Sequence, residues 1–422
     1  MSVLNNHSLS YYFSFFVQIF VFVIGSYYFS TSLFGWIQKK ERTTGDTQPA
    51  NVFALVIPSH NEEKVIGHML ESLKKLNYPE ELYDIFVIAD NCSDSTAAIA
   101  REKGAIVYER FNDVEKGKGY ALEWMFNKIF AMEKKYDAIV VFDADNIVSN
   151  NFLLEMDKQF KKGHKAVQGY IDSKNPFDSW ITCCYSIAFW TINRLFQLAR
   201  YNLNLCCMLS GTGFAISTDV LKKLGWGATC LTEDMEFTMK LALNNYKVSW
   251  AHNAIVYDEK PLTLSQSWLQ RKRWMQGHAD VASRYFKPLV LKAIKEGDIV
   301  ALDCAIYLLQ PLRIIAVGII MSLALLQNFY PHGKLGVFYI RYLFPNAIIW
   351  DLFVIAQFIY APFAMALEKK LNFKVMLGYL IYPYYGLTWI PITIHGILDK
   401  NKKEWFHTKH TRQISISELE KA

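Results

Sequence analysis

Two carboxylates separated by one residue stand at the end of an apolar run, DAIVVFDAD. Asp143 and Asp145 occupy positions i and i+2, so in an extended chain their side chains point to the same side. Carboxylate oxygens suit Mg²⁺ or Mn²⁺, and a pair leaves coordination positions for phosphate oxygens. The pattern predicts a divalent-cation site. A turn after a buried strand is the structural alternative.

A second acidic pair lies in the segment LTEDMEF. Thr232 is typical of a helix N-cap, and Glu233 and Asp234 would fall in the first turn, where the helix dipole stabilises carboxylates. Asp234 is a candidate general base for an attacking hydroxyl. A helix start without catalytic function explains the same residues.

The segment SWLQRKRWMQGH places an indole among cations and amides. Trp274 offers a flat apolar ring for a sugar, and the cationic and amide side chains around it are possible donors to a pyrophosphate. The alternative is a basic amphipathic stretch that lies on a membrane surface.

Other polar clusters follow predicted strands or open predicted helices. Asp90 and Asp94 in ADNCSDST could accept hydrogen bonds from a base or ribose, or cap the next helix. Lys118 stands between two glycines at a predicted helix start, which suits an anion or an ordinary glycine-rich loop. LSGTGF could bring backbone close to a sugar or serve only as a turn. The remaining candidates are Pro58, Asn61 and Glu62 in PSHNEE, and Gly211, Thr212 and Gly213 in LSGTGF.

Alternating strands and helices must position these clusters. Short apolar runs at 52–57, 84–89, 105–110 and 137–143 are predicted strands, and segments with helical spacing separate them. Such alternation favours a parallel sheet with helices on both faces, and ligands bind beyond the carboxyl ends of its strands. The polar clusters follow these ends.

Apolar segments flank this α/β region. Residues 11–36 carry no charge and, at about 1.5 Å per residue, exceed a hydrocarbon core of about 30 Å. We expect further spans at 312–330, 346–367 and 375–398. The run 299–310 is predicted to lie in the membrane plane or to extend the next helix.

Charge near the spans predicts the orientation but leaves a conflict. The basic cluster QKKER after the first span places the amino terminus outside and the α/β domain in the cytoplasm. Three later spans would put the carboxyl terminus outside, yet the tail 399–412 is strongly basic and should lie inside. We give the basic tail more weight than the number of predicted spans in assigning the side of the carboxyl terminus. Either one segment does not span, or a further span lies in 299–310 or 335–348.

The composition narrows the class of protein. Of 422 residues 52% are hydrophobic and 15% aromatic, with a net charge of +6. This mild charge argues against a nucleic-acid partner. None of the seven cysteines forms a CxxC pair, which argues against a disulfide framework and a zinc site and favours reduced thiols facing the cytosol.

Together and in this order, the motifs resemble the processive, membrane-embedded family 2 glycosyltransferases, a group with cellulose, hyaluronan and poly-N-acetylglucosamine synthases. The resemblance covers roughly residues 52–280. The matching residues are Asp90 and Asp94 for the uridine-side acid, Asp143-Ala144-Asp145 for DxD, Thr232-Glu233-Asp234 for TED, and Gln270, Arg273 and Trp274 for QxxRW.

This resemblance implies an α/β GT-A fold with a Rossmann-like mixed sheet, set between amino- and carboxyl-terminal membrane helices. It implies a UDP-sugar donor and Mg²⁺ or Mn²⁺ held chiefly by Asp145. The implied roles are as follows: Asp234 as base within the catalytic TED motif; Asp143, Lys118, Gln270, Arg273, Asp90, Asp94, Pro58, Asn61 and Glu62 on the donor; and Trp274, Gly211, Thr212 and Gly213 on the acceptor.

The predicted organisation has five parts. They are a transmembrane helix in 1–37, the glycosyltransferase domain in 52–260, interfacial helices with QxxRW in 261–298, a transmembrane channel region in 299–398, and a basic cytoplasmic tail in 399–422. The resemblance implies a multi-pass bacterial plasma-membrane enzyme.

That enzyme would polymerise UDP-glucose or a UDP-N-acetylhexosamine into a β-linked extracellular polysaccharide, with inversion, and translocate it. A growing glycan and the bilayer are the expected partners, and an accessory subunit is left open. Two alternatives remain: transfer of one sugar to a lipid acceptor, and an inactive scaffold or transport subunit.

Overall fold

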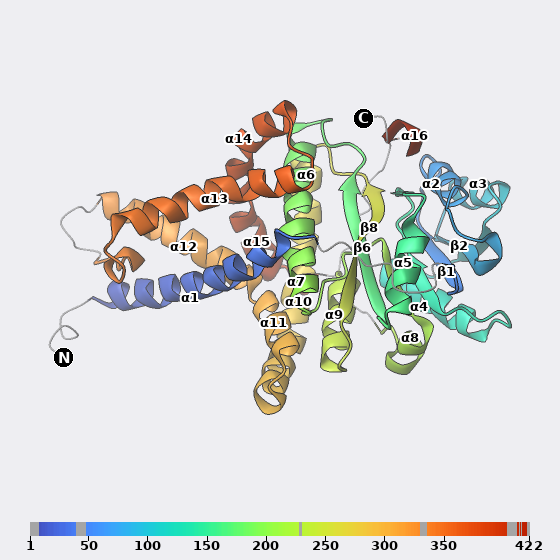
Figure 1. Cartoon of the computed structure of the whole chain (residues 1–422), viewed down its shortest axis with the longest axis horizontal. Helices are drawn as coiled ribbons and strands as arrows, with labels where there is room; N and C mark the ends of the chain where they lie inside the picture. The colour runs from blue at the N-terminus through green and yellow to red at the C-terminus, as the bar shows by residue number, and fades with distance from the viewer. Residues whose placement is uncertain are drawn as a thin grey trace.

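The computed structural model describes residues 8–38, 48–227, 230–329, 336–402, 412, 414 and 416–419. An α/β domain stands at one end, and a bundle of apolar helices projects from it (Figure 1). The basic residues of QKKER after Gln38, and most of the tail 399–412, lie outside the described residues.

The domain is built on one eight-stranded sheet in the order β3-β2-β1-β4-β7-β6-β8-β5. The first four strands in this order are parallel, β7 is antiparallel to both of its neighbours, β6 and β8 are parallel, and β5 is antiparallel to β8. The sequence pattern located β1 to β4 but not the later strands, which make the sheet mixed. The strands are β1 (Phe53–Ser59), β2 (Tyr83–Asp90), β3 (Ile106–Arg110), β4 (Ala138–Val141), β5 (Ile147–Val148), β6 (Ala166–Ser173), β7 (Phe214–Ser217) and β8 (Val248–Asp258).

Helices cover both faces of this sheet because its central strands are apolar on both sides. In β1, Phe53 and Leu55 join the core under α2 and α5, whereas Ala54 and Val56 join the core under α4 and α9. The helices and short helical turns of the domain are α2 (Ile66–Leu73), η2 (Glu80–Leu82), α3 (Thr96–Glu102), α4 (Lys118–Ala131), α5 (Phe152–Lys161), α6 (Trp180–Ile192), the π-helical η3 (Asn193–Leu198), α7 (Ala199–Asn202), α8 (Thr218–Leu224) and α9 (Glu233–Leu243).

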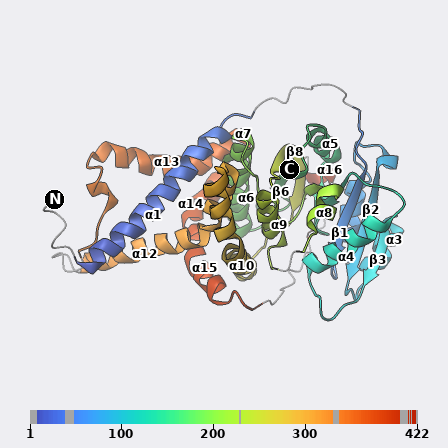
Figure 2. The ribbon, with the colours of Figure 1, turned by 90° about the horizontal axis from the view of Figure 1, so that it is seen from below.

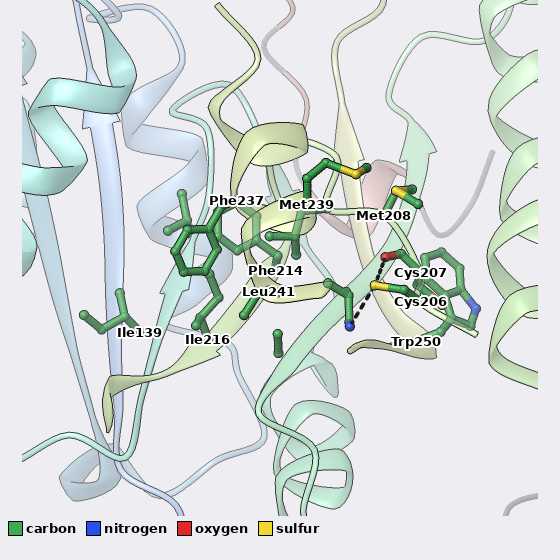
Figure 3. Close-up of a cluster of buried hydrophobic side chains, with 14 of the residues drawn as sticks. Ile139, Cys206, Cys207, Met208, Phe214, Ile216, Phe237, Met239, Leu241 and Trp250 are labelled. Atoms are coloured by element: carbon green, nitrogen blue, oxygen red, sulfur yellow. Dashed lines mark hydrogen bonds between the residues drawn. The ribbon is translucent and has the colours of Figure 1, made fainter. Parts of the chain in front are cut away.

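The core beneath α9 fixes the start of that helix, which carries the TED motif. Phe237 and Leu241 of α9 pack with Phe214 and Ile216 of β7 (Figure 3). All four side chains are buried. Complete burial of such side chains contributes about 1.5–3 kcal/mol each. The motif therefore sits on a rigid support.

Three helices among the described residues are long and apolar enough to cross a membrane. They lie side by side and extend away from the sheet (Figures 1 and 2). At their far end the backbone N–H of Phe338 donates to Ser14, and that of Ile340 donates to Gln18. The helices are α1 (Leu9–Ser32), which continues into η1 (Leu33–Gly35), α12 (Gln310–Phe329) and α13 (Ala347–Leu367), and η4 (Ile340–Tyr342) precedes α13.

The predicted span at 375–398 is not one helix. It consists of α14 (Phe373–Leu387) and α15 (Trp389–Leu398), which meet at Thr388. Pro391 lacks an N–H and cannot continue the hydrogen bonds of α14, whereas proline is accepted in the first turn of a new helix. Neither helix has the length of a span. The structure thus removes one of the three expected carboxyl-terminal spans.

The QxxRW segment lies in a single long helix where several interfacial helices were expected. Helix α10 (Leu264–Glu296) begins with a capping box between Thr263 and Gln266 and ends at Gly297 in a left-handed conformation. Helix α11 (Ile299–Leu308) is separate from α12 and is capped by Asp298. The last described helix is α16 (Ile416–Leu419). In both views α6 and α10 lie between the sheet and the apolar bundle.

Candidate active site

A cavity of about 850 Å³ opens at the carboxyl ends of β1, β2 and β4, against α9 and α10. It brings together every predicted site residue except Asp94 and Gly213. The predicted residues that line it are Pro58, Asn61, Glu62, Asp90, Lys118, Asp143, Asp145, Gly211, Thr212, Thr232, Glu233, Asp234, Gln270, Arg273 and Trp274.

Asp94 and Gly213 do not line the cavity. The Asp94 carboxylate accepts from the backbone N–H of Thr96 at 3.0 Å and from that of Glu63 at 3.1 Å, so it follows the capping alternative. Gly213 has φ +62°, and a Cβ there would lie 2.5 Å from Val256 Cγ1. The glycine permits close packing inside the sheet and does not line the cavity in which an acceptor was expected.

Asp90 lies at the end of the cavity formed by the loops after β1 and β2. Its side chain is buried, and Arg110 Nη1 donates to its Oδ1 at 2.7 Å. Burial raises the pKa of Asp90, while the Arg110 guanidinium opposes that shift. Asn61 Oδ1 accepts from the backbone N–H of Ser93 at 2.8 Å and ties the two loops together.

The DxD pair is held from three directions. Lys118 Nζ forms an ion pair with Asp143 and donates to the carbonyl of Gly211 at 2.6 Å. The backbone N–H of Asp143 donates to Thr212 Oγ1 at 3.0 Å. Asp145 is 5% exposed and accepts from the backbone N–H of Glu259 at 3.1 Å. This network keeps both carboxylates at the cavity wall.

Asp258 at the end of β8 is a cavity residue that the sequence analysis missed. Burial raises its pKa to about 6; Lys260 opposes this shift, and the charges of Asp145 and Asp143 add to it. The sequence shows acidic residues at the end of the apolar segment, in VYDEK. It does not show that this strand end lies beside the DxD loop.

The carboxylates of this region are hard oxygen donors that fit Mg²⁺ or Mn²⁺. Among the described residues no group of three or more His, Cys, Asp or Glu side chains is arranged to hold a metal ion. A cation here would therefore need further oxygen ligands from a diphosphate or from water.

Asp234 is partly buried and lines the same cavity. Burial and then the neighbouring charge of Glu233 raise its pKa to about 7, against the effects of the Met235 N–H, Lys118 and Arg273. A carboxylate that titrates near neutral pH is suited to general-base catalysis.

The three basic residues of the QxxRW segment have different surroundings. Arg271 is buried, and its guanidinium lies 4.3 Å from the centre of the Tyr385 ring. Lys272 forms an ion pair with Asp399. Arg273 lines the cavity and makes no hydrogen bond or ion pair with any described residue. Arg273 is thus the cation of this trio that is available to a ligand.

Trp274 lies in an aromatic wall of the cavity. Its ring stacks on Trp389 with centroids 6.4 Å apart and meets Tyr185 edge-on at 6.1 Å. Tyr385 also lines this wall. These three aromatic partners were missed because they lie within apolar patterns typical of membrane or core helices. Trp274 faces the cavity and not only a membrane surface.

Helix α10 contacts the TED motif through a glycine. A Cβ on Gly277 would lie 2.4 Å from Thr232 Oγ1, far below any normal contact. Helix α10 and the TED motif therefore touch, and a side chain at position 277 would separate them.

Known proteins resemble this chain over the region that contains the cavity. Residues 49–277 match the family model described as Glycosyltransferase like family 2. The Probable glycosyltransferase YdaM of Bacillus subtilis (strain 168) is 27% identical over 383 residues, which cover 85% of this chain and 87% of that protein.

Two other relatives match over a shorter stretch. The Beta-monoglucosyldiacylglycerol synthase of Synechocystis sp. is 28% identical over 250 residues, 56% of this chain and 50% of that protein. A Poly-beta-1,6-N-acetyl-D-glucosamine synthase of Staphylococcus epidermidis is 27% identical over 248 residues, 58% of each chain. The chain thus spans little more than half the length of these two relatives.

Among solved structures, the mannosyltransferase PcManGT from Pyrobaculum calidifontis, in complex with GDP-Man and Mn²⁺, has a TM-score of 0.59 at 13% identity. The match covers 92% of this chain and 100% of that one. At this identity the likeness shows the fold alone, and it confirms the GT-A fold. Because the family model covers more than half of the chain, this protein belongs to glycosyltransferase family 2.

Proposed function

We propose that the protein is a membrane-embedded, inverting glycosyltransferase that transfers the sugar of a UDP-sugar to a growing β-linked glycan. The observation that carries this proposal is one cavity shared by the DxD carboxylates, Asp234 and the uncommitted Arg273. The catalytic domain would lie on the cytoplasmic side of the plasma membrane, where nucleotide sugars are made.

Transfer would begin with Asp234 taking the proton of an acceptor hydroxyl. The acceptor oxygen would form a bond to C1 of the sugar as the bond from C1 to the β-phosphate oxygen breaks, and UDP would leave with that electron pair. Attack from the face opposite the leaving group inverts C1, so an α-linked donor gives a β-linked product.

Arg273 and Gln270 are placed to stabilise the departing diphosphate by hydrogen bonds and charge. Asp145, with Asp143 beside it, would hold a divalent cation, which neutralises negative charge on the diphosphate when bound. Asp90, held by Arg110, would contact the base or ribose. The positions of these residues around one cavity support these proposed roles.

The aromatic wall supports a sugar as acceptor. A pyranose has an apolar face that packs on an indole such as Trp274 while its hydroxyls remain available. The wall lies on α6, α10, α14 and α15, beside the apolar bundle through which we propose that the product leaves the cell.

A lipid acceptor is the second candidate, and a specific observation favours it. Ile192, Phe196 and Met208 line the cavity with apolar side chains, next to α6 and η3. Such a surface suits an acyl chain as well as a sugar face. The intact DxD and TED motifs argue against an inactive scaffold.

Product analysis separates these candidates. The protein, purified in detergent with Mn²⁺, would be incubated with radiolabelled UDP-glucose or UDP-N-acetylglucosamine, with and without dioleoylglycerol vesicles. Labelled polymer without added lipid supports the polymerase. A single-sugar lipid product supports the second candidate, and no turnover with either donor contradicts both.

A further inference from the structure

His278 belongs to the cavity, although the sequence analysis assigned it no role. It follows Trp274 by four residues on α10, so both side chains lie on one face of the helix. The side chain is 2% exposed and lines the cavity. Its Nε2 atom has no hydrogen-bond partner among the described residues. A buried polar atom without a partner is uncommon and costs free energy unless a ligand satisfies it.

The protonation of His278 follows from its surroundings. Backbone groups of Tyr307 and Leu308 act on the ring and oppose the effect of burial, whereas Nε2 has no hydrogen-bond partner among the described residues. We therefore assign the proton of the neutral ring to Nδ1. Burial lowers the pKa of His278 to about 4, so the ring is neutral at pH 7. With its proton on Nδ1, the ring presents a free lone pair at Nε2.

Tyr307 of α11 completes the polar end of the cavity. Its ring stacks on that of His278 with centroids 5.2 Å apart and an interplanar angle of 26°. Its hydroxyl makes no hydrogen bond with any described residue and lines the same cavity. Burial, and then the charges of Tyr28 and Asp234, raise the pKa of Tyr307, so its hydroxyl remains protonated. Tyr307 is also close enough to Asp234 for the two groups to interact electrostatically.

The residues of α10 that line the cavity therefore follow one another along the helix axis. Gln270, Trp274 and His278 recur every four residues, about 6 Å apart. Gln270 also carries a buried oxygen without a hydrogen-bond partner. If Gln270 lies beside the diphosphate and Trp274 beneath the acceptor, His278 lies one turn further along the acceptor.

We propose that His278 and Tyr307 form a subsite for a hydroxyl group of the acceptor. Nε2 of His278 accepts a hydrogen bond from this hydroxyl, and the Tyr307 hydroxyl donates one to it. The subsite rests on the proposed glycosyltransferase function and deepens it. It fixes the rotation of the acceptor on Trp274, and hence which acceptor hydroxyl reaches Asp234. This makes the two residues determinants of linkage.

The test uses His278→Phe, which keeps the ring stacking but removes the lone pair, and Tyr307→Phe, which removes only the hydroxyl. His278→Gln, which returns an accepting oxygen, is the rescue variant. His164→Phe is the matched control, because His164 also lies against a tyrosine ring, that of Tyr201, but outside the cavity. Purified variants would receive UDP-glucose with cellotetraose or dioleoylglycerol vesicles as acceptor.

We expect His278→Phe and Tyr307→Phe each to lower kcat/KM for transfer about 3- to 10-fold, the effect of one lost hydrogen bond. UDP affinity should stay unchanged. The share of donor hydrolysed by water should rise, and the product should contain mixed linkages. His278→Gln should regain part of the rate, and His164→Phe should match the wild type.

Wild-type transfer and a single linkage in both phenylalanine variants would overturn the subsite, provided that the variants fold, as thermal unfolding would show. Loss of UDP binding together with transfer would also contradict it, because a general packing defect would then explain the result. If the wild type itself released no UDP from any donor, the proposed function would fail, and the subsite with it.

Discussion

Asp94 and Asp234 show how surroundings separate two similar carboxylates near helix starts. Asp94 accepts hydrogen bonds from Thr96 and Glu63, which outweigh the effect of burial and lower its pKa. Asp234 accepts one from its neighbour Met235, and burial beside Glu233 raises its pKa. Asp94 is held as a charged cap, whereas Asp234 can take up a proton near neutral pH.

Asp234→Asn should abolish transfer while nucleotide binding persists. The amide keeps the shape of the side chain but cannot accept the acceptor proton, so a loss of about 10²–10⁴-fold is expected. Radiolabelled transfer and calorimetric UDP binding would measure the two properties. A variant that transfers at the wild-type rate would show that Asp234 is not the base.

The raised pKa of Asp234 predicts the pH dependence of activity. Because the base must be ionised, kcat/KM should fall tenfold per pH unit below a midpoint near pH 7. Rates measured from pH 5 to 9 would show this limb. A midpoint near the ordinary value of about 4 would assign the limb to another group.

The raised pKa of Asp234 also predicts how stability depends on pH: stability should fall as pH rises, whereas activity should rise. Folding raises the pKa of Asp234 from 3.8 to about 7, so the folded protein binds more protons than the unfolded chain between these values. The contribution of Asp234 to the free energy of unfolding is fully present below pH 4 and is lost as the pH rises toward 7. Asp234→Asn should therefore raise the unfolding temperature at pH 8 relative to the wild type, but not at pH 4. An equal shift at both pH values would contradict this.

At the scale of elements, α10 connects the two halves of the site. Its capping box starts the helix beside the domain, and its middle carries Arg273 and Trp274 into the cavity. On another face, Gly396 of α15 packs so closely that a Cβ would lie 2.7 Å from Met275 Cβ. The helix is therefore positioned by contacts on several sides.

Gly277→Ala should damage the site through this helix. The new Cβ would meet Thr232 Oγ1 at 2.4 Å and push α10 away from the TED motif. We expect at least a tenfold loss of kcat and a lower unfolding temperature, as for overpacking that costs about 1–3 kcal/mol.

Gly25→Ala is the matched control for this change, since Gly25 is also helical and has no atom within 4 Å of an added Cβ. It should leave activity unchanged and stability equal or slightly higher, because alanine favours a helix over glycine. Wild-type activity in Gly277→Ala would show that the contact with Thr232 does not position the site.

At the scale of the whole molecule, the carboxyl-terminal contacts bear on the topology. Gln276 Nε2 donates to the carbonyl of Asp399 at 2.9 Å. The backbone N–H of Arg412 donates to Glu259, and its guanidinium pairs with Asp178. With α12 and α13 as the two long carboxyl-terminal helices, the chain returns to the side of the catalytic domain. If α12 and α13 both cross the membrane, the basic tail would lie on the side of the catalytic domain, as the charge pattern predicts.

This arrangement predicts where each end reacts. A cysteine introduced at Lys400 should react with an impermeant maleimide only from the cytoplasmic side, like one at the exposed Lys162 of the domain. A cysteine at Ser8 should react from outside, because α1 begins at the far end of the bundle (Figure 1). Labelling of Lys400→Cys in intact cells would contradict the two-helix return.

The sequence alone determined the parts of this protein that depend on local chemistry. Period-two and continuous apolar runs located β1 to β4, a long uncharged segment identified α1, and the spacing of acidic and basic-aromatic residues identified DxD, TED and QxxRW. These signals survive because each arises within one segment, where strand geometry or helix capping acts on near neighbours.

Only the tertiary structure decided what depends on contacts between distant segments. The sheet order brings Asp258 close to the DxD pair. Hydrogen bonds from the backbone of Thr96 and Glu63 hold Asp94 as a helix cap. The helix break at Thr388 divides the predicted span 375–398 into two helices, which contribute to the aromatic wall. His278 lines the cavity beside Tyr307 of α11, a contact between two helices that the sequence does not reveal. Burial and partner atoms set such outcomes, and one segment's residue order does not contain them.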